Sequence, residues 1–200
     1  MASNVSQAEL EYYRAYGRSI IAWNVAEEEL RALMVAICGH GLAVQALTAR
    51  MDALAMQSAL QTIGDAYDNW PNDVGAHLCH LVAGLGILRL YRNSYVHDIN
   101  DVTSTPGAAV ASFYKFEAKG EFKIASRVEP ASRIEDFHDA VESLRAYVRD
   151  IATHFQMPAS LRRKLNREAL PLASLKKPIW PRALCTNRQR LLERQTQPRP

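Results

Sequence analysis

Arg92, Asn93 and His97 bring together three side chains that could act on a phosphate group. Arginine carries a permanent positive charge that stabilises phosphate oxygens. Histidine changes its protonation state near neutral pH and can serve as a general acid or base. These residue types could therefore bind a phosphate group and transfer a proton beside it.

The spacing of five positions between arginine and histidine is not specific by itself. The same spacing occurs from Arg133 to His138 and from Arg149 to His154. Both of these pairs fall within the last predicted helix, whereas Arg92 and His97 come at the end of a long apolar helix. The position of each pair relative to the helices therefore favours Arg92 and His97.

Apolar side chains recur every three or four positions in three long segments, which is the spacing of one face of an α-helix. The first stripe consists of Tyr13, Tyr16, Ile20, Trp23, Leu30, Met34 and Ile37, the second of Leu78, Leu81, Leu85, Leu88, Tyr95 and Ile99, and the third of Ile134, Phe137, Val141, Leu144, Val148, Ile151 and Phe155. A further helix is predicted over residues 44–67. Capping-box spacings at Ser6 with Glu9 and at Ser132 with Glu135 mark two helix starts.

Residues 110–116 and 121–127 are rich in aromatic and branched side chains and flank a turn at Gly120, which is typical of a β-hairpin. The sequence therefore predicts an all-α fold: an antiparallel bundle of four or more helices with a small β-hairpin insertion between the third and fourth long helices. We expect this domain to cover residues 1–157, with the hairpin at about 110–127.

Residues 158–200 differ from the rest of the chain in charge and in proline content. They hold 11 lysines and arginines against 2 acidic residues, whereas residues 1–157 hold 13 against 19. A basic, Pro-rich and mostly extended C-terminal tail is predicted, which either solubilises the protein or binds RNA or an acidic protein surface. Ile179 and Trp180 could anchor it. The candidate RNA-binding side chains are Arg162, Arg163, Lys164, Arg167, Lys176 and Lys177.

Neither a metal site nor a cofactor site is predicted. The three cysteines show no CxxC pairing, and no carboxylate cluster suits magnesium. His77 and His80 lack a clear third ligand, so we interpret them as a surface and a core residue of a helix. No signal peptide or membrane span is expected, because His80 and Arg89 interrupt the longest apolar run. A reducing, cytoplasmic location is the simplest interpretation.

Two of the apolar stripes each contain one charged residue, Glu27 in the first and Arg92 in the second. A buried charge without a partner is costly, so we expect these two side chains to form an ion pair. Glu28 is the alternative partner. On an ideal helix His97 lies about 140° around the axis from Arg92. A catalytic site would therefore need either a local unwinding near Ser94 or a second subunit.

The segment Arg92-Asn93-Ser94-Tyr95-Val96-His97, at the end of an apolar helix within a helical domain, resembles the signature of the HEPN superfamily of small helical ribonucleases. That signature is an arginine, a polar residue and, after four to six intervening positions, a histidine. The resemblance covers at most residues 7–155. In one subgroup a tyrosine stands two residues after the histidine, where this chain has Ile99, so a toxin modified by a nucleotidyltransferase is disfavoured.

The resemblance implies a metal-independent endoribonuclease in which the motifs of two subunits face each other. Two copies of His97 would then supply the base and the acid, and two copies of Arg92 would stabilise the phosphate. Asn93 would orient His97 or the phosphate, and Tyr95 could stack on a base or donate a hydrogen bond. A toxin or phage-defence role is plausible for such an enzyme, with an antitoxin or another protein as partner.

Many HEPN relatives have lost catalysis and act as RNA-binding or assembly modules. A non-enzymatic helical module with a basic, nucleic-acid-binding tail is therefore the alternative hypothesis. A third is an antitoxin or immunity protein whose basic tail covers an acidic partner.

Overall fold

The structure is a computed structural model that describes residues 6–66, 74–105, 108–119, 121–130, 132–156 and 175–181. Its elements, in chain order, are α1 (Gln7–Cys38), α2 (Leu42–Thr48), α3 (Ala53–Ala66), α4 (Val74–His97), β1 (Ile99–Thr105), β2 (Ala108–Lys119), β3 (Glu121–Pro130) and α5 (Arg133–Gln156). The prediction of a mostly helical protein with a small antiparallel sheet is confirmed.

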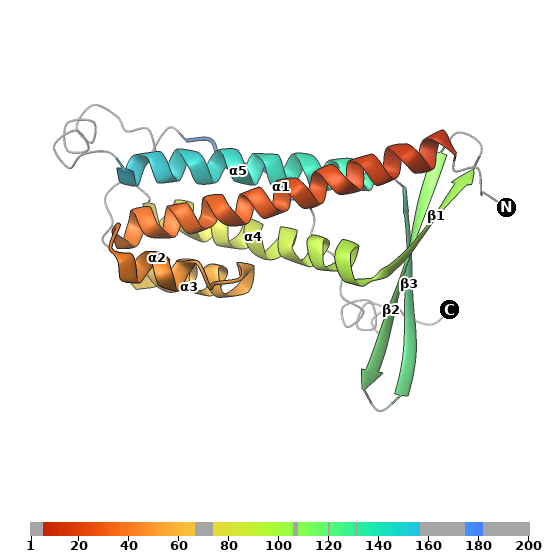
Figure 1. Cartoon of the computed structure of the whole chain (residues 1–200), viewed down its shortest axis with the longest axis horizontal. Helices are drawn as coiled ribbons and strands as arrows, with labels where there is room; N and C mark the ends of the chain where they lie inside the picture. The colour runs from red at the N-terminus through yellow and green to blue at the C-terminus, as the bar shows by residue number, and fades with distance from the viewer. Residues whose placement is uncertain are drawn as a thin grey trace, which may run out of the picture.

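Three long helices, α1, α4 and α5, run along the long axis of the molecule, with α2 and α3 at one end and the sheet at the other (Figure 1). The apolar stripes of α4 and α5 form the centre of the core. Leu78, Leu81, Leu85 and Leu88 of α4 are fully buried, and all seven residues of the α5 stripe are buried. The helical period of the sequence therefore identified the inward faces of these two helices.

The buried face of α1 is displaced from the stripe that its large residues indicated. Tyr13 is 51% exposed, whereas the small residues Ala15, Ser19 and Ala22 are buried. The Ser19 hydroxyl donates a hydrogen bond to the Ile134 carbonyl at 3.2 Å. Small side chains on α1 thus let the backbone of α5 come close. The face of α1 that carries these small residues is therefore buried, and Tyr13 remains largely exposed.

The orientation of α1 and α5 differs from that expected of an antiparallel bundle. Ser19 contacts Ile134, and Glu29 pairs with Arg145 at 3.2 Å, so residue numbers increase in the same direction along both helices. The two helices are parallel. α4 runs opposite to α5, since His77 contacts Tyr147 near one end and Tyr95 lies near Arg133 at the other.

An additional chain reversal explains this difference. The helix predicted over residues 44–67 is two helices, α2 and α3, separated at residues 49–52. The Asp52 carboxylate accepts a hydrogen bond from the Ala55 amide at 2.8 Å and caps α3, while Arg31 of α1 donates to the Met51 carbonyl at 3.1 Å. Two side-chain contacts thus stabilise the break, together with turn hydrogen bonds from the Arg50 and Met51 amides to the Leu47 and Thr48 carbonyls.

The sheet has the order β1-β2-β3 with antiparallel pairs. β2 and β3 contain the two segments predicted as strands, and β1, which was not predicted, pairs with the first half of β2. Val102, Ala111 and Phe113 are buried against the helices. The β2–β3 hairpin extends beyond β1 and away from the helices (Figure 1).

Residues 175–181, blue in Figure 1, return to the helical domain. The Trp180 ring stacks on His80 with a centroid distance of 5.2 Å, and its Nε1 donates to the His80 carbonyl at 3.0 Å. The ring occupies the space that a side chain at position 84 would fill, where the chain has glycine. Ile179 is 93% exposed, so of the two predicted anchors only Trp180 contacts the core.

Among the described helices, α4 is long and apolar enough to cross a membrane by length and composition alone, with a mean hydropathy of 1.4 in its most apolar window. Half of that window is buried inside the protein. The central helix of a packed domain passes the same test.

Candidate functional site

Arg92, Asn93 and His97 lie in the last two turns of α4. The Arg92 Nη1 atom is 3.4 Å from His97 Nε2 and 3.2 Å from Asn93 Oδ1, so the arginine joins both residues. The Asp98 amide still bonds to the Ser94 carbonyl, which shows that the helix is not unwound here. His97 is exposed at the end of the helix. The three candidate catalytic side chains therefore meet within one subunit.

The expectation that Arg92 and His97 could meet only through an unwound helix or a second subunit was wrong. The angle of about 140° describes the directions in which the two side chains leave the helix axis. The arginine side chain is long enough to run along the helix surface and bridge that angle. Because arginine only donates hydrogen bonds, His97 Nε2 is the acceptor in this contact. The other ring nitrogen, Nδ1, makes no hydrogen bond with the residues that the structure describes.

The predicted ion pair between Glu27 and Arg92 is not formed. Glu27 instead accepts a hydrogen bond at 2.7 Å from the indole Nε1 of Trp23, one turn earlier on the same helix. Glu28, the alternative partner, is largely exposed and pairs with Arg31 at 2.7 Å. Partners on α1 itself therefore satisfy both carboxylates, and Arg92 has no ion pair with any carboxylate that the structure describes.

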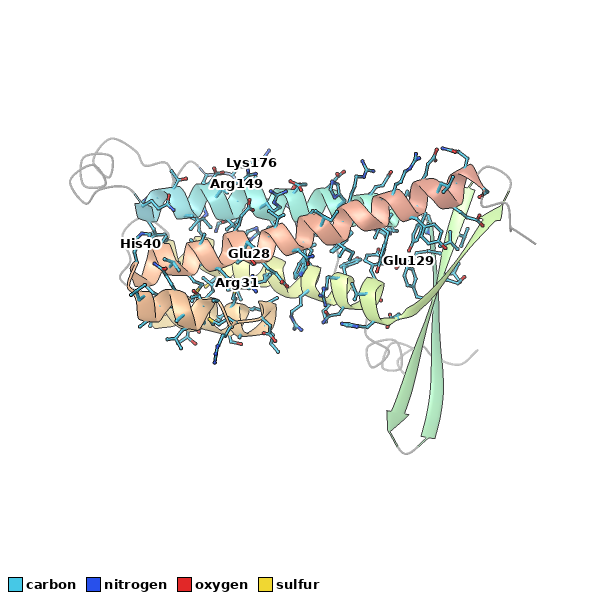
Figure 2. The ribbon with its side chains drawn as sticks, in the orientation of Figure 1. Glu28, Arg31, His40, Glu129, Arg149 and Lys176 are labelled. Carbon is cyan, nitrogen blue, oxygen red and sulfur yellow. The ribbon has the colours of Figure 1, made fainter. Side chains whose placement is uncertain are left out.

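Glu27 and Arg92 nevertheless line the same cavity, which has a volume of about 430 Å³ and lies between α1, the start of α3 and the end of α4. Its lining comprises Trp23, Glu27, Arg31, Ala49, Arg50, Met51, Asp52, Ala53, Leu54, Arg89, Arg92 and Asn93. Arg31 extends from α1 toward α2 and α3 (Figure 2). Four arginines and two acidic residues therefore line the cavity, and one of the arginines is the candidate catalytic residue Arg92.

Of the four arginines that line the cavity, only Arg92 was a predicted site residue. Arg89 shares its helix flank with Asn93 and His97, a relation visible in the sequence as steps of four residues. Arg31 and Arg50 lie on α1 and after α2, and no local pattern connects them to α4. The one sequence signal for Arg50 is its place two residues before Asp52, the cap of α3, which is recognisable only once the break at residues 49–52 is known.

Tyr95 does not lie at the site. Its ring is 1% exposed and packs against Phe113 and Phe137, with centroid distances of 5.4 and 5.3 Å. Its hydroxyl donates to the Glu129 carboxylate at 3.3 Å, and its carbonyl accepts a hydrogen bond from Tyr16. The residue is part of the core, because it falls on the buried stripe of α4, and it cannot stack on a nucleobase.

The two other arginine–histidine spacings lack these features. Arg133 lies 3.6 Å from Asp136 in the first turn of α5. Arg149 lies 3.9 Å from Glu29, and His154 is buried. Of the three pairs, Arg92 and His97 combine mutual contact, an exposed imidazole and an adjoining cavity.

His77 and His80 are structural. The His77 ring is buried, with its Nδ1 2.6 Å from the Tyr147 hydroxyl, and His80 Nε2 lies 2.9 Å from the Pro178 carbonyl. Burial raises the pKa of Tyr147, which keeps its hydroxyl protonated as a partner for His77. His77 is thus the core residue, and His80 is covered by the C-terminal segment. No group of three or more potential metal ligands occurs in the part of the chain that the structure describes.

The candidate RNA-binding residues of the tail are divided between described and undescribed segments. Arg162, Arg163, Lys164 and Arg167 lie outside the described residues. Lys176 and Lys177 are exposed on the docked segment, and Lys176 is labelled in Figure 2. Comparison with known proteins adds no assignment for the site: no family model, curated protein or solved structure matches the chain.

Proposed function

We propose that the protein is a metal-independent endoribonuclease with a HEPN-type helical domain, active as a homodimer. The observation that supports this most directly is the contact between Arg92 and His97 beside Asn93 at the exposed end of α4. A phosphate that binds Arg92 would lie within reach of the His97 imidazole. His97 could then take the proton of a ribose 2′-hydroxyl while the guanidinium stabilises the charge on the phosphate.

One subunit offers only one such histidine. Protonation of the leaving 5′-oxygen requires an acid, and a second copy of His97 would supply it in a symmetric dimer. Arg92 and His97 already meet within one subunit, so the second subunit is not needed to assemble this pair. Its role in the proposal is to supply the second histidine, which protonates the leaving oxygen. A cytoplasmic toxin or phage-defence role, with an antitoxin as possible partner, belongs to the same proposal.

The test is cleavage of single-stranded RNA by the purified full chain in the presence of EDTA. We expect products with 2′,3′-cyclic phosphate ends, and a rate about 10²–10⁴-fold lower for His97→Ala. His40→Ala is the matched control, because His40 is also exposed but lies after α1 at the other end of the helical domain. Cleavage that EDTA abolishes, or that His97→Ala leaves unchanged, would refute the proposal.

A non-enzymatic RNA-binding module is the second candidate. It is favoured by the exposed lysines Lys176 and Lys177 on a segment that docks against the helices. In that case the RNA affinity would fall steeply with salt concentration and no cleavage would be detected at any enzyme concentration. Replacement of both lysines by glutamine would lower the affinity, while His97→Ala would not.

A further inference from the structure

The cavity beside Arg92 is lined by more positively charged than negatively charged residues. Arg31, Arg50, Arg89 and Arg92 line it together with Glu27 and Asp52. Arg31 is the only one of the four that forms an ion pair with a carboxylate in the described part of the chain, and its partner Glu28 is not a lining residue. The lining thus contains three arginines that form no ion pair with a described carboxylate, and such an excess of positive charge attracts an anion.

Most of the hydrogen-bonding capacity of these three side chains is unused by the described residues. Arg89 makes a single long contact, 3.4 Å from its Nε to Gln57 Oε1, and the Arg50 guanidinium makes none. Arg92 uses only Nη1, and its Nε is buried without an acceptor. Buried donors without acceptors are rare in folded proteins, so the unused donors of Arg92 are consistent with a ligand that supplies an acceptor.

The start of α3 adds a second kind of donor. Ala53 and Leu54, the first two residues of this 14-residue helix, lie in the cavity lining. The first N–H groups of a helix have no acceptor within the helix, and its N-terminus carries partial positive charge. The Asp52 carboxylate caps a later amide, that of Ala55. The N-terminus of α3 therefore adds partial positive charge at this end of the cavity.

The two carboxylates of the lining narrow the choice of ligand. Glu27 and Asp52 each hold one of their oxygens in a hydrogen bond, to Trp23 and to the Ala55 amide. Their other oxygens can accept from N–H or O–H groups. A volume of about 430 Å³ exceeds that of an inorganic anion and falls within the range of about 300–1,000 Å³ that is usual for small-molecule sites. A phosphate attached to a sugar and a base offers both an anion and hydrogen-bond donors.

We infer that this cavity is a nucleotide phosphate site, in which Arg50 and Arg89 bind the phosphate and Arg92 marks the side of the cavity next to His97. The inference does not require catalysis by His97. If the proposed function holds, the phosphate belongs to an RNA strand and neighbours the one that is cleaved. A free mononucleotide would offer the same phosphate group and is the other candidate ligand.

The experiment measures binding by calorimetry with three probes: inorganic phosphate, adenosine 5′-monophosphate and a single-stranded oligonucleotide with 2′-O-methyl riboses, which cannot be cleaved by 2′-hydroxyl attack. The full-length variants are Arg50→Gln and Arg89→Gln, each expected to weaken binding about tenfold, as lost charge-assisted hydrogen bonds do. Arg18→Gln is the matched control, because Arg18 is exposed on α1 outside the cavity. Arg50 is also exposed, so its variant tests the site without disturbing the core.

Binding of phosphate and of the mononucleotide, weakened in both cavity variants, supports a free nucleotide as the ligand. Binding of the oligonucleotide alone, weakened in the same variants, supports an RNA strand. Equal affinities of Arg50→Gln, Arg89→Gln and Arg18→Gln, or no binding of any probe, would overturn the inference.

The binding measurement can refute the cavity assignment without refuting the proposed nuclease, and the cleavage assay can do the opposite. His97→Ala should retain binding of all probes that the unaltered protein binds. Binding that depends on Arg50 and Arg89 in a protein that never cleaves RNA would refute the nuclease and keep the cavity assignment. RNA cleavage together with unchanged binding in the two cavity variants would support the nuclease and refute the cavity assignment.

Discussion

The two halves of α4 carry histidines in opposite environments. In the first half, His77 and His80 are covered by Tyr147 and Trp180, and each has a hydrogen-bond partner at 2.6 or 2.9 Å. In the second half, His97 is exposed, and Arg92 beside it keeps donors without acceptors next to a cavity. Polar groups that the protein itself satisfies stabilise the fold, whereas groups left open at a cavity are available to a ligand.

Apart from His97→Ala, the largest effect is expected from Arg92→Lys, in the exposed half of α4. A lysine ammonium is a single point charge and cannot contact Asn93, His97 and a phosphate with the fixed fork of a guanidinium. We expect RNA cleavage to fall about 100-fold, which corresponds to about 2.7 kcal/mol of transition-state stabilisation, with little change in thermal stability. Arg18→Lys is the control, and a rate for Arg92→Lys equal to that of this control would remove Arg92 from the site.

Gly84→Ala tests the covered half of the helix. A Cβ at this position would come within 2.2 Å of the Trp180 ring, so the ring must leave its place. We expect a loss of about 1–2 kcal/mol in the free energy of unfolding and faster limited proteolysis of the C-terminal segment. Gly75→Ala is the control, because a Cβ there meets only an ordinary contact at 3.8 Å. Unchanged proteolysis would show that Trp180 does not hold the segment in solution.

Tyr147→Phe tests the covered half of α4 through the pH dependence of the free energy of unfolding. The substitution removes the hydroxyl that contacts His77 and should cost about 1 kcal/mol at neutral pH. Burial raises the pKa of Tyr147 above its ordinary value of 10.0, so the unfolded chain loses this proton first. The contribution to stability is complete below pH 10 and declines as the pH rises above it. Urea unfolding at pH 8 and pH 10.5 should show a smaller alkaline loss for the variant, and equal losses would contradict the assignment.

The smallest effect is expected from replacing Lys176 and Lys177 together by glutamine. Both side chains are exposed on the segment that Trp180 anchors to the covered half of α4. We expect RNA affinity to fall about two- to fivefold at low salt, since two phosphate contacts at most are lost. The cleavage rate at saturating RNA should not change. A loss of cleavage comparable to that of Arg92→Lys would mean that the two halves of the helix act as one site.

How much of the fold could be predicted depends on the residue types at each interface. The stripes of α4 and α5 consist of large apolar residues, and their period marked the buried faces correctly. The stripe of α1 was displaced because its contact with α5 uses small residues such as Ala15 and Ser19, which carry little hydropathy signal. The break before α3 was missed because Arg31, far away in the sequence, supplies one of the two contacts that stabilise it.

The sequence by itself determined the local part of the candidate site. Arg92, Asn93 and His97 lie on consecutive turns of one helix, so the short chain distance and the length of the arginine side chain are sufficient to bring them together. Only the tertiary structure decided that Glu27 bonds to Trp23, that Tyr95 is buried, and that Arg31, Arg50 and Arg89 gather around one cavity. Those arrangements depend on how separate helices pack, and helix packing is fixed by the fit of many side chains that no single stripe of residues encodes.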